Sequence, residues 1–141
     1  MALKEQVPNV YSVGLYNVGS YQVSGTPYIT GSNTLAAGQE DRIVFPAVTR
    51  TITVMNHITG GSEEPIRVHF NATGSGNVVG GFHYILLNSD EDSYTISVKC
   101  KEIYVSAPST NSTNAEYRII AELTNIAPER MYNLTGSGLT D

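Results

Sequence analysis

Three histidines, one cysteine and a short acidic turn are the side chains in this sequence that could do chemistry. Zinc is held by three or four Cys, His or carboxylate ligands that lie close together. His57 and His69 fall on the polar faces of two strands predicted below, whereas Cys100 falls on an apolar face and is expected to point inward. We therefore interpret His57 and His69 as polar-face residues beside threonines, with His83 as the one further histidine, and we predict no metal site.

The acidic turn Asp90 to Asp92 could offer oxygen ligands to calcium. It lacks the glycine and the terminal glutamate of an EF-hand loop, so we interpret it as a solvated turn between strands. Cys100 is interpreted as a small core side chain rather than a reactive thiol.

No motif in the sequence assembles a nucleophile, a base and an orienting group. The sequence contains no G-x-S-x-G, no H-E-x-x-H and no phosphate-binding glycine loop, because Gly14 to Gly19 (GLYNVG) is not followed by lysine. We predict no catalytic residues and no cofactor, and we expect that the protein is not an enzyme.

Two stretches that alternate apolar and polar residues form the centre of the predicted fold. Arg50 to Ile58 reads RTITVMNHI and Ile66 to Ala72 reads IRVHFNA. Successive side chains of a strand point to opposite faces, so this period of two predicts two half-buried β-strands. The intervening TGGSEEP, with its glycines and proline, predicts a loop that joins the two strands as a hairpin.

Further strands are predicted on both sides of this pair. Phe82 to Leu87 (FHYILL) is a continuous apolar run, which favours a central strand covered on both faces. The remaining predicted strands are Tyr21 to Thr30, as a core strand or hairpin, Asp41 to Phe45, Tyr94 to Cys100, Ile103 to Ala107 and Glu116 to Ile126.

The apolar phase changes between the strands at Tyr94 to Cys100 and Ile103 to Ala107. The apolar residues occupy even positions in the first and odd positions in the second. A slip of one residue reverses every side chain, so the chain must bulge, or bend and change sheets, near Lys101. Seven or eight short strands separated by Gly, Asn, Ser and Pro turns predict an all-β protein, an antiparallel β-sandwich or jelly roll without a convincing helix.

Composition limits the possible partners. The 141 residues suffice for one domain, and the net charge of −5 with a pI near 5.1 argues against nucleic acid as a partner. No apolar run approaches the roughly 20 residues of a membrane span, so no membrane partner is expected. With a single cysteine and no secretory signal, we expect synthesis in a cytoplasm.

The most unusual feature is the absence of Asp, Glu, Lys and Arg from Gln6 to Gln39. One interpretation is that this stretch packs along its own domain. The other is that residues 1–20 form an extended arm that lies on another subunit, since interfaces are poor in charge and favour tyrosine. The second interpretation divides the chain into an arm at 1–20, a β-sandwich domain at 21–127 and a C-terminal tail at 128–141.

The arm and the tail supply the candidate interface residues, which are apolar or aromatic. They are Val10, Tyr11, Val13, Leu15, Tyr16, Val18, Tyr21, Met131, Tyr132 and Leu134.

Three stretches together resemble virion structural proteins of tailed bacteriophages, of the kind found in marine phages such as cyanophages. They are VPNVYSVGLYNVGSYQVSGTPYITGS, FPAVTRTITVMNH with IRVHF, and YRIIAELTNI with MYNLTGSGLTD. The resemblance implies a capsid decoration or cement protein on the virion surface, assembled in the host cytoplasm. The implied partners are the major capsid protein and further copies of the chain, as a homo-oligomer such as a trimer. A receptor-binding or carbohydrate-binding module of a tail or fibre is the alternative.

Overall fold

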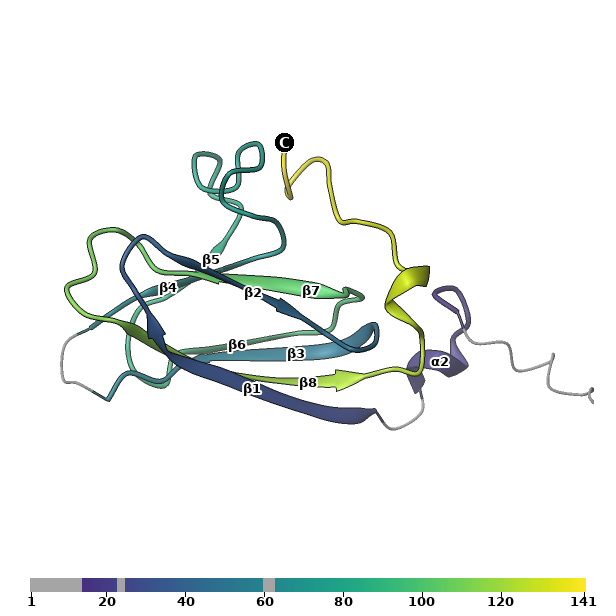
Figure 1. Cartoon of the computed structure of the whole chain (residues 1–141). Coiled ribbons are helices and arrows are strands. Elements are labelled where there is room, and N and C mark those ends of the chain that lie inside the picture. The colour runs from purple at the N-terminus through teal and green to yellow at the C-terminus, as the bar shows by residue number, and fades with distance from the viewer. Residues whose placement is uncertain (1–13, 23–24, 60–62) are drawn as a thin grey trace, which may run out of the picture.

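The computed structural model describes residues 14–22, 25–59 and 63–141 and forms an antiparallel β-sandwich of two four-stranded sheets (Figure 1). One sheet has the order β1-β8-β3-β6 and the other β2-β7-β4-β5. The all-β sandwich predicted from the sequence is confirmed. The strands are β1 (Thr26–Leu35), β2 (Glu40–Val44), β3 (Thr49–Asn56), β4 (Ile66–His69), β5 (Ile85–Leu87), β6 (Ser93–Ile96), β7 (Glu102–Ser106) and β8 (Ala115–Leu123).

The core lies between the two sheets because each central strand turns one face inward. In β3, Ile52 and Val54 are buried and alternate with half-buried neighbours, as the sequence predicted. In β8, Ile119 and Ala121 are buried and alternate with exposed residues. Full burial of such side chains contributes about 1.5–3 kcal/mol each, so this alternation supplies much of the stability.

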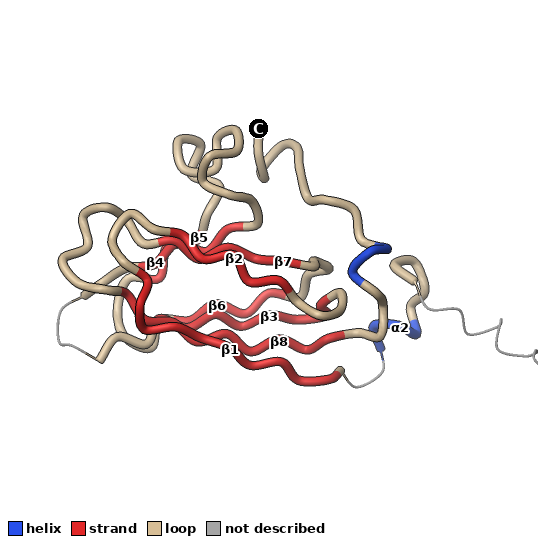
Figure 2. Tube along the Cα trace, viewed as in Figure 1, coloured by secondary structure: helices blue, strands red, loops and turns tan. Residues whose placement is uncertain are grey.

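The strands are hydrogen-bonded in nested pairs. β1 pairs with β8, β2 with β7, β3 with β6 and β4 with β5. Additional pairing of β3 with β8 and of β4 with β7 joins these pairs into sheets. The hairpin predicted between the two central strands is wrong, because β3 and β4 lie in opposite sheets and pair with other strands. Strands, coloured red in Figure 2, thus make up the two layers, with long loops at their ends.

The predicted central strand Phe82–Leu87 is wrong in both length and position. Only Ile85–Leu87 is a strand, and it lies at an edge, pairing with β4 alone. Phe82 has a φ of 62° and a side chain that is 77% exposed. Its backbone N–H, like that of His83, donates to a carbonyl within the preceding turn. An apolar run carries no period, so the sequence could not distinguish an exposed turn from a buried strand.

The change of phase near Lys101 is a change of sheet, one of the two outcomes expected. β6 belongs to the sheet of β1 and β8, whereas β7 belongs to the opposite sheet. The strand predicted over Tyr94 to Cys100 already ends at Ile96, and the link that follows brings Cys100 into the core.

The segment around α2 and the segment that follows β8 pack together beside the sandwich. A short helix, α2 (Gly19–Gln22), replaces the start of the strand predicted from Tyr21, and a 3-10 helix follows β8 at Pro128–Arg130. Leu15 and Met131 are buried in a small cluster with Val48 and Ile126. Residues 14–20 are therefore a turn and the start of a helix rather than an extended arm, and residues 1–13 lie outside the described residues.

No helix within the described residues is long and apolar enough to cross a membrane.

Candidate functional site

The potentially reactive side chains do not gather into one site. Among the described residues, no three of His, Cys, Asp and Glu are grouped as a metal-binding set would be. His57 lies near Asp90, with 4.0 Å between Nδ1 and Oδ1. Cys100 is buried, as predicted for a core side chain, and burial raises the pKa of its thiol to about 11. The thiolate needed for nucleophilic attack is thus disfavoured.

His69, predicted on a polar face, is instead buried. Its Nδ1 lies 2.6 Å from the Asn71 carbonyl oxygen, which can only accept, so Nδ1 carries the proton. Nε2 then accepts a hydrogen bond of 2.8 Å from the Ser106 hydroxyl, and the ring stacks on Tyr104. The neutral ring is therefore fully hydrogen-bonded. Loop residues 70–84 and the C-terminal segment cover what would otherwise be the outer face of this sheet (Figure 1).

Acidification is expected to destabilise the fold through His69. Burial, the dominant effect, lowers the pKa of His69 below its ordinary value of 6.5, against weaker opposing effects of the Asn71 carbonyl and Glu40. As the pH falls, the unfolded chain binds the proton at a higher pH than the folded chain does. The contribution of His69 to stability is therefore fully present above about pH 6.5 and is lost as the pH drops below it. Urea unfolding at pH 7.5 and 5.5 measures the loss. In the His69→Gln variant, this contribution to the pH difference disappears.

Glu64 is a buried carboxylate that the sequence analysis did not single out. It accepts hydrogen bonds from the Ser112 hydroxyl and from the backbone N–H groups of Ser112 and Thr113. These bonds, that of the Ser112 hydroxyl foremost, lower the pKa of Glu64 despite its burial. Its role is to fasten the loop before β8 to the segment before β4.

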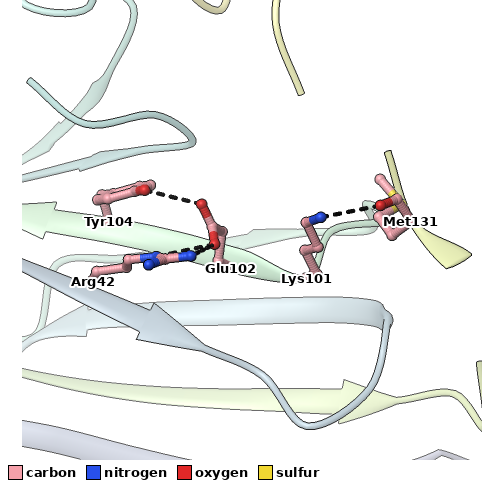
Figure 3. Close-up of polar contacts among 5 residues, drawn as sticks. All are labelled: Arg42, Lys101, Glu102, Tyr104 and Met131. Carbon is pink, nitrogen blue, oxygen red and sulfur yellow. Dashed lines mark hydrogen bonds and ion pairs between the residues drawn. The ribbon is translucent and has the colours of Figure 1, made fainter. Parts of the chain in front are cut away.

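A polar cleft of about 380 Å³ lies between β2, β7 and the C-terminal segment. In Figure 3, Arg42 and Tyr104 both point at Glu102, while Lys101 reaches the backbone of Met131. Arg42 Nε donates to Glu102 Oε1 at 3.0 Å, and the Tyr104 hydroxyl donates to Oε2 at 2.9 Å. The cleft is lined by Arg42, Phe70, Asn71, Cys100, Lys101, Glu102, Tyr104, Tyr132, Asn133, Leu134 and Thr135.

The ion pair cancels two of the three charges that line this cleft, and Lys101 keeps the third. Arg42 and Glu102 balance one another, and the Lys101 ammonium donates to the Met131 carbonyl at 3.1 Å. What remains is a hydrogen-bonding surface with the partly exposed ring of Tyr132 at its border. Such a surface could bind a polar, uncharged ligand through hydrogen bonds and ring stacking, but it offers no activated nucleophile.

The C-terminal wall of the cleft is held by close backbone contacts. Asn71 Nδ2 donates to the Leu134 carbonyl at 2.6 Å, and the Asn77 N–H donates to the Thr140 carbonyl at 2.8 Å. Gly76 permits the second contact, because a Cβ there would collide with the Thr140 carbonyl oxygen and its φ is +53°.

Gly76→Ala is expected to release the C-terminal turn 136–141. Both the collision and the positive φ oppose the alanine, so the hydrogen bond from Asn77 to Thr140 should break while the sandwich stays folded. Hydrogen exchange should show faster exchange at Asn77 and residues 138–141. Gly74→Ala is the matched control, since it lies in the same loop with no atom near its Cβ position. Equal exchange in the two variants would contradict the prediction.

A second candidate region lies at the end of the sandwich beside α2. Tyr16 is 88% exposed and Val18 is 64% exposed. The Lys99 ammonium lies 5.1 Å from the ring centroid of Tyr16 and 5.4 Å from that of Tyr21, and it donates to the Leu15 carbonyl at 3.0 Å. Lys99 thereby fastens this turn to the sandwich while leaving the apolar side chains in solvent.

Comparison of the chain with known protein families, with curated proteins and with solved structures finds no match.

The local geometry alone therefore defines the second region, which we call the end surface: Tyr16, Val18, Tyr21 and Tyr132. Burial and, second, the Tyr132 phenol raise the pKa of Tyr21. A shallow depression of about 420 Å³ is lined by Leu15, Tyr16, Asn17, Val18, Tyr21 and Lys99.

The interface residues predicted from the sequence separate into three groups. Tyr16, Val18 and Tyr132 are exposed and available to a partner. Leu15 and Met131 are buried in a small cluster of the chain itself, so their side chains are not free to contact a partner. Tyr21 and Leu134 are half-buried and pack against the same cluster. Val10, Tyr11 and Val13 lie outside the described residues.

The sequence analysis missed Lys99 at the end surface and the polar residues of the cleft. Lys99 falls within the strand predicted over Tyr94 to Cys100, and no spacing in the sequence links it to Tyr16. Arg42 and Glu102 stand sixty positions apart and meet only because β2 pairs with β7.

Proposed function

We propose that this chain is a virion structural protein of a tailed bacteriophage that decorates or cements the assembled head. The observation that carries the proposal is the end surface. There the Tyr16 and Val18 side chains are 88% and 64% exposed at one end of the sandwich. Exposed apolar side chains that lie together are typical of protein interaction sites. The proposed activity is binding rather than catalysis. The chain is proposed to bind the major capsid protein and further copies of itself.

The chemistry of the end surface suits a contact that is repeated on a shell. Its phenol rings and aliphatic side chains carry no charge, so covering them costs little polar desolvation. The one cation beside them, the Lys99 ammonium, already donates to the Leu15 carbonyl. A protein that binds only the assembled shell stabilises it by mass action. Contacts that are weak singly become strong when several copies are linked, because the second contact forms at a high effective concentration.

The strand order also supports the proposal, by fold-level analogy alone. The nested pairing of β1 with β8, β2 with β7, β3 with β6 and β4 with β5 is the order of a jelly roll. Viral capsid domains and lectins both use jelly rolls. The analogy therefore favours a capsid role and a carbohydrate-binding role equally.

Labelling of purified virions tests the proposal. An antibody against the chain, detected with gold particles in the electron microscope, should decorate the heads at many sites per particle. Mass spectrometry of the same virions should give a fixed number of copies of the chain per copy of the major capsid protein. Absence of the chain from purified particles would overturn the proposal.

The polar cleft supports one alternative, a receptor-binding or carbohydrate-binding module of a tail or fibre. Its hydrogen-bonding groups and the ring of Tyr132 provide what a sugar needs, namely polar contacts and a stacking surface. In this case the gold label should lie at the tail, and a glycan array should show specific binding that Tyr132→Ala abolishes. Tyr28→Ala, at a tyrosine packed against the core away from the cleft, serves as the control for array binding.

A further inference from the structure

The sandwich is incompletely closed along one side, between the edge strands β5 and β6. Tyr94 of β6 is paired with Val54 of β3, and Ile85 of β5 is paired with Val68 of β4. Directly paired residues share a sheet face, so Tyr94 and Ile85 face inward like their buried partners. They are nevertheless 38% and 43% exposed. Their inner faces are left uncovered where the two sheets should meet.

The resulting groove, which we call the edge groove, has a volume of about 290 Å³. Its lining contains no Asp, Glu, Lys or Arg and consists of Val68, Phe70, Phe82, His83, Tyr84, Ile85, Tyr94, Ile96, Gly138 and Leu139. Phe82, whose φ of 62° is uncommon for a bulky residue, borders the groove with its ring largely in solvent. Packing in the core therefore does not account for that conformation.

We propose that the edge groove binds residues 7–13 of a second copy of this chain as an added strand. The inference rests on the proposed function, of which it specifies one contact between copies. The first argument is chemical complementarity, because the groove lining and the segment VPNVYSV are both free of ionised side chains. Neither surface would leave an unpaired charge buried when the two meet.

The second argument is backbone pairing. Within the described residues, β5 and β6 each pair with one neighbouring strand only, so the other edge of each is open to a further strand. A free sheet edge binds extended peptides by strand addition, with alternate side chains entering pockets. In an added strand Tyr11 and Val13 share one face, which places both toward the groove.

The third argument is reach. Seven extended residues span up to about 23 Å, enough to leave one domain and lie along a strand edge of the next. The described chain begins next to α2, beyond the end of β8 (Figure 1). The groove is lined by residues of β5 and β6.

Disulfide trapping between two differently tagged copies tests the proposal. One copy carries Tyr11→Cys and the other carries Tyr94→Cys, and the buried Cys100 does not compete. On mixing and mild oxidation, the two tags should join about a hundredfold faster than in the control, because a bound segment raises the effective concentration to the millimolar range. The control replaces Tyr94→Cys by Ile29→Cys, an exposed apolar position on β1 outside the groove.

A rate equal to that of the Ile29→Cys control would overturn the inference. It would also be overturned if a chain carrying both Tyr11→Cys and Tyr94→Cys closes its own disulfide at a rate independent of protein concentration, because the segment then fills its own groove. Tyr94→Lys provides a second measurement without cysteine chemistry. It should fold with the normal circular dichroism spectrum but shift the oligomer seen by light scattering toward the monomer.

The inference and the proposed function fail in different ways. If the copies cross-link but the chain is absent from virions, the arm contact holds and the virion role does not. If gold labels the heads but no cross-link forms between copies, the virion role holds and the edge groove has another occupant.

Discussion

Replacing Tyr16 and Val18 together by serine is expected to abolish binding of the protein to phage heads. Truncating aromatic anchors at an interface commonly costs about 2–4 kcal/mol, which corresponds to about 30- to 900-fold in Kd. Repetition of the contact across a shell enlarges the difference in occupancy. Cosedimentation of the variant with heads that lack the native protein measures the effect.

Folding is not expected to change in this double variant, because both side chains are exposed. The contact of Lys99 with the Tyr16 ring is lost, but the contact with Tyr21 and the hydrogen bond to Leu15 remain. Ile29→Ser is the matched control, since its side chain is 69% exposed on the outer side of β1. Normal head binding by the double variant, or equal loss in the control, would exclude the end surface as the contact.

Asn56→Ala is expected to reduce the free energy of unfolding by about 2–6 kcal/mol. Asn56 is buried at the end of β3, and its Nδ2 donates to the carbonyl oxygens of Glu64 at 3.1 Å and Leu87 at 3.0 Å. It thereby ties one sheet to β5 of the other. Each buried polar group left without its hydrogen-bond partner costs about 1–3 kcal/mol. Alanine at position 56 leaves the carbonyls of Glu64 and Leu87 without the Nδ2 donor. Equilibrium unfolding in urea measures the loss.

Thr53→Ala provides the matched control for this prediction. Thr53 lies three positions earlier on the same strand, and its hydroxyl shares a hydrogen bond of 2.8 Å with Thr95 on the exposed face. Water replaces that bond on mutation, so we expect a loss of at most about 1 kcal/mol. Similar losses in the two variants would show that Asn56 does not bridge the sheets as described.

The sequence predicted those parts of the fold in which burial alternates. Ile52 and Val54 in β3, and Ile119 and Ala121 in β8, each turn to one covered face, and that repeat is visible in the sequence. The continuous apolar run beginning at Phe82 carries no such repeat. Its conformation depends on the hydrogen bonds of the preceding turn, which no local pattern encodes.

The candidate surfaces were less predictable, because cores and interfaces use the same side chains. The lack of charge singled out Tyr16 and Val18, which are exposed, yet it applied equally to Leu15, which is buried in the cluster with Met131. Which of these residues remains exposed depends on where the chain turns at α2. The cleft depends on the pairing register of β2 with β7, so its residues have no signature in the sequence.

The nested strand pairing also determines how the protein must be made. Ile29 in β1 pairs with Ile120 in β8, so on a ribosome adding about 5–20 residues per second, roughly 5–18 s separate the synthesis of these two partners. During that interval the nascent chain displays an unpaired β1 preceded by a segment with no ionised side chain to keep it in solution. Contacts this distant in sequence also close slowly. Overproduction should therefore be limited by aggregation during translation, and slower synthesis or added chaperones should raise the yield of soluble protein.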